Sequence, residues 1–233
     1  MIGLRNMKIK QLLKQSWEIC IKQWKLIAFI IFVAYLPLNL FLEFSPMAQI
    51  DISDMQAFIK ITQISGFYEL LIGSFAGILI ILMTKQVMEG KKTSFTELWS
   101  SKFNIPTYGR FVWTTLIKNL LIGLLMLLLF IPGLLFAIYW LFAEQIAVLD
   151  NEGGINALTK SQAMVKGKWF SFFAFALAGF LVPIIGGLII VNGQLFLVDH
   201  WAFNLLTSFI ADLFQAFFIV YLTVGYLKIR KTA

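Results

Sequence analysis

Three ionisable side chains lie inside long apolar segments of this sequence, and their type and position suggest chemistry more directly than those of other residues. They are Lys118, Glu144 and Asp212. A charge inside a membrane is costly, so each of these residues needs a partner or a function. Gln215 lies close to Asp212 on the same helical face and extends a small polar stripe. The sequence therefore points to polar sites within apolar segments.

Side chains for enzyme chemistry are scarce. The single histidine, His200, follows Asp199, and the single cysteine, Cys20, completes no set of metal ligands with it. No H-E-x-x-H, G-x-S-x-G, Walker A or dinucleotide-binding pattern is present. A proton-transfer role for Asp199 and His200 is the weaker alternative, because adjacent residues seldom point at one substrate. We expect no enzyme activity, no metal and no cofactor.

The composition is that of an integral membrane protein. Of the 233 residues, 60% are hydrophobic and 13% are charged, far outside the range of soluble proteins. The net charge of +7 comes from basic residues that flank the apolar segments, where membrane orientation and anionic headgroups explain them. We expect membrane lipids as partners, leave other membrane proteins open, and expect no nucleic acid. The sequence does not indicate an oligomeric state.

The stretch from Trp113 to Leu149 is divided by Ile131-Pro132-Gly133. An uninterrupted helix over this stretch would be roughly 55 Å long, whereas the hydrocarbon core is about 30 Å thick. Pro132 has no N–H to donate, and Gly133 accepts a positive φ. The pattern favours two short spans joined by a turn at Pro132 and Gly133. A single long helix kinked at Pro132 is the alternative.

The same reasoning along the chain predicts an all-α fold, a polytopic transmembrane helix bundle that forms one membrane domain over residues 1–233. Amphipathic helices are expected at the cytoplasmic interface near residues 4–24, 94–99 and 155–165, and a short surface helix after Ser53 on the outer side. The six spans are expected at about 26–42, 67–88, 113–130, 134–149, 169–191 and 202–227. In the fifth, Pro183, Gly186 and Gly187 predict a kink or a closely packed neighbour.

The distribution of basic residues favours six spans with both termini in the cytoplasm. This arrangement leaves Lys60 as the only one of the 19 Lys and Arg residues on the outer side. A five-span arrangement would place the basic residues from Lys160 onwards outside, against the bias that orients membrane helices.

The turn also places two of the intramembrane charges near each other. If the chain reverses at Pro132 and Gly133, Lys118 and Glu144 lie within about one helical turn of the same depth. We therefore expect them to form a structural ion pair between the third and fourth spans.

Asp212 has no evident basic partner at its depth in the sixth span. A structural role is favoured, in which an amide or a hydroxyl satisfies the carboxylate, over a role in transport or proton relay. The amides considered are Asn192, Gln194 and Asn204.

A family resemblance rests on four short segments within residues 131–169. They are Ile131-Pro132-Gly133, DNEGG at 150–154, ALTKS at 157–161 and VKGKW at 165–169. Together they resemble a group of six-span bacterial inner-membrane proteins of uncharacterised function, which is similar to the membrane domain of some glycerophosphoryl diester phosphodiesterases. The resemblance implies a bacterial plasma membrane location and no established substrate. It transfers no catalytic residue, because the activity of those proteins belongs to a soluble domain that we do not expect here.

Two classes of function follow from these observations. The first is a non-catalytic multi-pass protein that acts through lipid or protein contacts, as a membrane-organising, immunity or accessory subunit. The alternative is a small transporter or channel for a lipid-like or peptide substrate, suggested by the broken fifth span and by Asp212 and Gln215. A water-filled path lined by Asp212 favours transport, whereas a dry bundle with an apolar groove favours the first class.

The topology is testable with a reporter enzyme that is active only outside the cytoplasm, fused after Ala233. We expect the fusion to be inactive, because six spans return the C-terminus to the cytoplasm. Strong reporter activity would contradict the six-span arrangement.

Overall fold

The computed structural model describes residues 9–44, 55–101, 103–196 and 201–232, and every regular element within these ranges is a helix. The expected all-α class is confirmed. In chain order the elements are α1 (Ile9–Lys22), α2 (Trp24–Phe44), α3 (Met55–Tyr68), the π-helical turn η3 (Glu69–Gly73), α4 (Ser74–Met88), α5 (Phe95–Ser101), α6 (Ile105–Leu128), α7 (Phe130–Tyr139), α8 (Ala143–Leu149), α9 (Ile155–Val165), α10 (Trp169–Phe196) and α11 (Trp201–Thr232).

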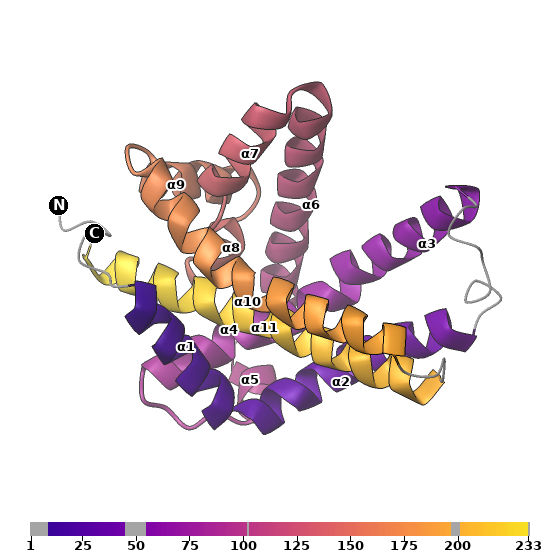
Figure 1. Cartoon of the computed structure of the whole chain (residues 1–233). Helices are drawn as coiled ribbons and strands as arrows, with labels where there is room; N and C mark the ends of the chain where they lie inside the picture. The colour runs from indigo at the N-terminus through magenta and orange to yellow at the C-terminus, as the bar shows by residue number, and fades with distance from the viewer. Residues whose placement is uncertain (1–8, 45–54, 102, 197–200, 233) are drawn as a thin grey trace.

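Six helical segments of the described chain are long and apolar enough to cross a membrane, in agreement with the expected number of spans. The start of α1 and the end of α11 lie at one end of the molecule, whereas the end of α2 and the start of α11 lie at the other (Figure 1). The six segments are Trp24–Phe44, Ile59–Met88, Ile105–Leu128, Phe130–Leu149, Trp169–Leu188 and Trp201–Lys231.

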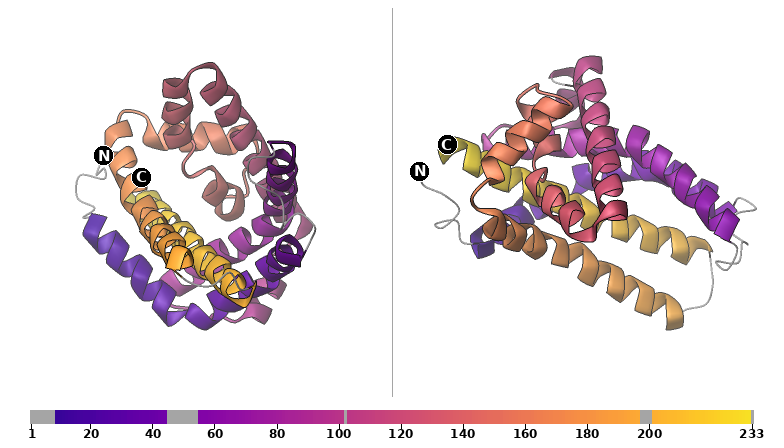
Figure 2. Two further views of the ribbon diagram at one scale, coloured as in Figure 1. Left: turned by 45° about the vertical axis from the view of Figure 1, so that its right-hand side comes forward. Right: turned by 90° about the horizontal axis from the view of Figure 1, so that it is seen from above.

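Helix α11 forms the centre of the packed part of the molecule and contacts α1, α2, α4 and α10. It lies side by side with α10 along most of its length (Figure 2). Small residues allow this approach, because the ring of Tyr221 lies over Gly179 and the ring of Phe175 over Gly225. The two rings stack with their centroids 4.5 Å apart, and the Tyr221 hydroxyl donates to the carbonyl of Phe175 at 3.0 Å. Close packing of small and aromatic residues thus joins α10 and α11.

The expected weak point in the fifth span is a site of close packing. Helix α10 continues as one helix through Pro183. A Cβ atom at Gly186 would lie 2.5 Å from Cδ2 of Phe214, whereas Gly187 has open space around it. Of the two expected alternatives, the structure shows the closely packed neighbour, on α11.

The expected second span, 67–88, is the C-terminal part of a longer helix. Elements α3, η3 and α4 follow each other without a break, so the expected separate surface helix is instead the beginning of the spanning helix. The sequence between residues 55 and 65 contains neither Pro nor Gly, and the single Gly66 costs a helix only about 1 kcal/mol. Ser53, the expected cap, lies outside the described residues.

The chain reverses between α6 and α7, but the turn is not at Pro132 and Gly133 as expected. The break is at Leu129, whose φ of −153° and ψ of 113° end α6 and begin α7. Pro132 lies in the first turn of α7, where a missing N–H costs no hydrogen bond because first-turn N–H groups have no partner within the helix. Gly133 has no positive φ.

Gly133 is needed for close packing instead. A Cβ atom at this position would lie 2.8 Å from the backbone nitrogen of Met126 and 2.9 Å from its Cα. Any side chain at residue 133 would therefore push α7 away from α6.

The expected fourth span, 134–149, is broken into α7 and α8 by a turn at residues 140–142. Ser161 of α9 stabilises this break, since its hydroxyl donates to the carbonyl of Tyr139 at 2.8 Å and accepts from the N–H of Phe142 at 3.1 Å. Residues 140–142 contain no Pro or Gly from which the sequence could predict the turn. Helix α8 is buried from Gln145 to Leu149.

The α6–α7 hairpin leans away from α10 and α11 at a steep angle, and does not lie parallel to them (Figure 1). Little of α6 is packed within the chain, and Leu120 and Leu127 are exposed. The molecule therefore combines a tightly packed group of helices around α11 with an open side between α6 and α3.

Substitution of Gly133 by Ala is expected to destabilise the protein. Overpacking of a close contact costs about 1–3 kcal/mol, and the contact here is with backbone atoms of Met126. Gly123→Ala on α6 is the matched control, because nothing lies within 4 Å of a Cβ atom at Gly123. The apparent melting temperature of the detergent-purified variants measures the effect. Equal melting temperatures for both variants would contradict the close contact.

Candidate functional site

Lys118 of α6 and Glu144 of α8 form an ion pair between Nζ and Oε1. Their side chains are 18% and 24% exposed, and the Thr115 hydroxyl donates to the same carboxylate oxygen at 3.4 Å. The α6–α7 hairpin brings these residues together, as the sequence predicts, because α8 packs back against α6.

Glu69, which the sequence analysis overlooked, lies in the π-helical turn η3. Its Oε1 accepts a hydrogen bond from the Tyr35 hydroxyl at 3.0 Å and from Nε2 of Gln215 at 3.4 Å. The sequence does indicate Glu69, because this residue is an ionisable side chain inside the expected span 67–88. The same property singled out Lys118. Such π-helical turns occur often at functional sites.

Asp212 and Gln215 on α11 have different partners. Asp212 accepts a hydrogen bond from Nδ2 of Asn39 on α2, at 3.3 Å, and Gln215 donates to Glu69. The amides proposed from the sequence are not the partner in the described chain. Asn204 donates to Glu43 at 3.2 Å, and the side chains of residues 192 and 194 lie outside the description.

A half-open cavity of about 530 Å³ brings most of these polar residues together. Its walls come from the end of α3, where Gly66 lines it, and from η3, α4, α6, α7, α8 and α11. Helices α3 and α6 diverge as two arms in Figure 1. Aromatic and aliphatic residues, among them Phe111, Trp140 and Phe218, complete the lining. The polar residues that line it are Glu69, Ser74, Thr115, Lys118, Asn119, Glu144, Gln145 and Gln215. Asp212 is not among the lining residues.

One buried polar atom in the wall of this cavity lacks a partner. Gln145 is 1% exposed, and its Oε1 accepts no hydrogen bond from the described residues. Because buried amide oxygens are normally hydrogen-bonded, this atom lacks a donor that the described residues do not supply.

A second polar cluster lies at the end of α8, where Asp150 and Lys160, both outside the spanning segments, meet the last turns of α11. The Asp150 carboxylate contacts Nζ of Lys160 at 2.6 Å, the Tyr226 hydroxyl at 2.7 Å and the Arg230 guanidinium at 2.8 Å. Burial raises the pKa of Asp150, but hydrogen bonds from Lys160 and Tyr226 and the charge of Arg230 outweigh burial and hold the pKa below its usual value. The hydrogen bond to Asp150 raises the pKa of Lys160. The cluster therefore stays charged at neutral pH and ties α8 and α9 to the end of α11.

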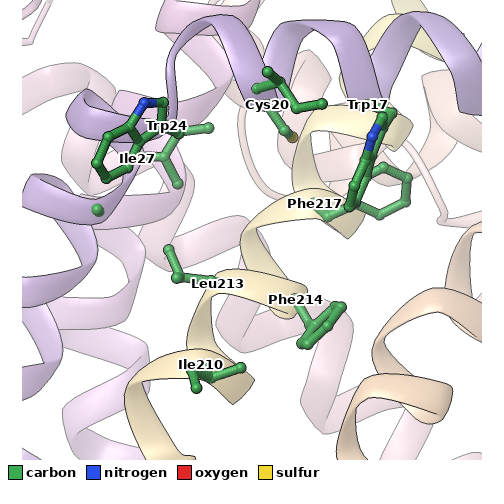
Figure 3. A pocket seen from close by; sticks show the side chains of 10 residues that line it. Trp17, Cys20, Trp24, Ile27, Ile210, Leu213, Phe214 and Phe217 are labelled. Carbon is green, nitrogen blue, oxygen red and sulfur yellow. The ribbon is translucent and has the colours of Figure 1, made fainter. Parts of the chain in front are cut away.

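An apolar groove of about 270 Å³ lies between α11 and the corner formed by α1 and α2. Figure 3 shows Trp17 and Trp24 at its two edges and Leu213 and Phe217 below. Burial raises the pKa of the Cys20 thiol, which also lines the groove, to about 12. The thiol is protonated at neutral pH and therefore a poor nucleophile.

Neither polar region has the ligands of a metal site. No group of three His, Cys, Asp or Glu side chains in the described chain is placed to hold a metal ion. Asp199 and His200 lie outside the described residues.

Charge reversal tests the pairing of Lys118 and Glu144. Lys118→Glu and Glu144→Lys are each expected to lower membrane expression and melting temperature, because breaking a buried pair costs about 3–5 kcal/mol and this pair is only partly exposed. The double reversal restores the attraction and is expected to recover most of the loss.

The matched control is the reversal of Lys14 and Glu18 on α1, whose side chains are 78% and 62% exposed. No measurable change is expected there. A double Lys118 and Glu144 variant that is no better than either single variant would show that the two charges do not interact.

Comparison with known proteins gives a family and no activity. Residues 78–231 match the family described as "Domain of unknown function (DUF8558)". No curated protein and no solved structure is similar enough to the chain to be matched. The matched range contains Lys118, Glu144, Asp212 and Gln215, but begins after Glu69. Because it covers well over half of the 233 residues, the chain belongs to this family of unknown function.

Proposed function

We propose that this protein is a non-catalytic multi-pass membrane protein that takes an amphiphile from the bilayer into the cavity between α3 and α6. Glu69, Lys118, Glu144 and Gln215 would contact the polar part of the ligand. The apolar lining would contact its chains.

The exposure of Glu69 and Gln215 is the observation that carries this proposal. Both are exposed within helical segments that are long and apolar enough to cross a membrane. Glu69 and Gln215 are hydrogen-bonded to each other, but each has further polar atoms. Lipid tails cannot hydrogen-bond to a carboxylate or an amide, so contact with hydrocarbon would leave these remaining polar atoms unsatisfied. A polar occupant of the cavity removes this cost.

The mixed lining and the open side of the cavity favour an amphiphile over a purely polar ligand. Phe67 of α3 and Leu120 of α6 are 69% and 68% exposed, so the two arms beside the cavity have apolar outer surfaces suited to lipid. A volume of about 530 Å³ is within the range of ligand sites, about 300–1,000 Å³. It suits a headgroup and the first part of its chains.

The location and orientation of the protein in the membrane are part of this proposal. We place the protein in a bacterial inner membrane with both termini in the cytoplasm, because this arrangement leaves only Lys60 of the basic residues outside. The amphipathic character of α1, with Trp17 and Trp24 beside the apolar groove, suits a position at the lipid interface. A relationship to the membrane domain of glycerophosphoryl diester phosphodiesterases receives no support from the comparisons.

Transport of the amphiphile is the second candidate, and polar side chains along α11 favour it. Asn204, Asp212, Gln215 and Arg230 follow each other along this helix, and each contacts an acidic or amide side chain of another element. Such residues offer polar contacts in the first half of the span and again at its end. Asp212 does not line the cavity, so retention of a ligand is the simpler function.

Filling the cavity tests the proposal. Ala137 is half-buried in its wall, and Ala137→Phe is expected to reduce lipid retained by the purified protein at least about fivefold, since the larger ring occupies ligand space. The matched control is Ala211→Phe on the exposed surface of α11, which leaves the cavity open. Native mass spectrometry of protein extracted in mild detergent measures bound lipid. Equal retention by the two variants would refute the cavity as the binding site.

A further inference from the structure

The charges that line the cavity leave one carboxylate without a basic partner. Lys118 is paired with Glu144, and Glu69 has hydrogen bonds only from the neutral groups of Tyr35 and Gln215 among the described residues. With Glu69, Lys118 and Glu144 all ionised, the lining groups carry a net charge of −1. This balance favours a cationic ligand.

The hydrogen-bonding groups give a second, independent indication. Both hydrogen bonds to Glu69 end on Oε1, so Oε2 is available to a further donor. Gln145, 1% exposed, is among the residues that line the same cavity, and its buried Oε1 has no partner in the described part of the chain. The lining residues thus include two unused acceptors, and a ligand that satisfies them must bring N–H or O–H donors.

We infer that the cavity selects amphiphiles with a primary ammonium group, and that this group binds between Glu69 and Gln145. The inference rests on the proposed function and names its ligand class. A primary ammonium combines a positive charge with three N–H donors, which matches one carboxylate and one amide oxygen. An anionic headgroup would be repelled by Glu69. A quaternary ammonium has the charge but no N–H donor for Gln145.

Two kinds of molecule carry a primary ammonium group, namely an aminophospholipid, in its headgroup, and a free amine. An amphiphile is favoured because aromatic and aliphatic residues such as Phe111 and Phe218 form the rest of the lining. Free ethanolamine lacks the chains that would contact these residues.

Native mass spectrometry of the full-length protein with lipids of identical acyl chains tests the inference. The probes are phosphatidylethanolamine, phosphatidylcholine and phosphatidylglycerol, with free ethanolamine as competitor. We expect phosphatidylethanolamine to be retained about tenfold more than phosphatidylglycerol, the change that one charge-assisted contact of about 1.4 kcal/mol produces. Displacement of the lipid by millimolar ethanolamine would assign recognition to the amine alone, and its absence to the amphiphile.

Two variants locate the preference. Glu69→Gln is expected to reduce retention of phosphatidylethanolamine to the level of phosphatidylglycerol, whereas Glu18→Gln, on the exposed face of α1, should leave the ratio unchanged. Gln145→Met removes the unsatisfied oxygen, so it should raise the melting temperature of lipid-free protein and lower retention of phosphatidylethanolamine. This variant keeps the inference testable if Glu69→Gln does not fold.

The outcomes separate this inference from the proposed function. Equal retention of all three lipids, lowered equally by Ala137→Phe, would overturn the ammonium preference and leave the cavity as a lipid site. Tight retention of phosphatidylcholine together with phosphatidylethanolamine would overturn the role of the N–H donors. Retention that Ala137→Phe does not change would overturn both proposals.

Discussion

A carboxylate among membrane-spanning helices must find a donor or a cation, and this requirement sets how the helices of this protein are placed relative to one another. Apolar surfaces alone specify little in a bilayer, because lipid tails are as apolar as leucine. The contacts of Asn39 with Asp212, of Tyr35 with Glu69 and of Lys118 with Glu144 each join different helices. Each pair fixes a register along helices that could otherwise slide.

The molecule has two kinds of packing. Around α11, glycine residues admit aromatic rings, as at Gly179 and Tyr221, and the contact is close. On the side of α3 and α6 the helices diverge (Figure 1), and polar groups line the space between them. The closely packed part gives a stable frame, and the open part holds exposed polar groups such as Glu69.

The Asp150 cluster connects these two parts. Its ionic contacts join α8 and α9 to the end of α11, and α8 carries Glu144 and Gln145 into the cavity. The position of the cavity wall therefore depends on a charged contact at the end of α8. The Asp150 side chain is 6% exposed, whereas those of Lys160 and Arg230 are 39% and 48% exposed, so solvent and salt reach the contact from the basic side.

The sequence by itself determined the helical class, the number of spanning segments and the pairing of Lys118 with Glu144. Apolar runs of spanning length leave only helices as a solution, and a hairpin of known length sets which residues share a depth. Glu69 was also available from the sequence, since it interrupts an apolar run. These properties are local, or depend on a single short connection.

Only the tertiary structure decided the rest. Asn39 and Asp212 lie far apart in the chain, and no spacing rule relates two helices whose relative rotation is unknown. The break after Tyr139 depends on Ser161 of another helix, and the position of the turn at Leu129 depends on how closely Gly133 approaches Met126. The cavity itself arises from the angle between α3 and α6, which depends on the packing of several helices and on no single segment.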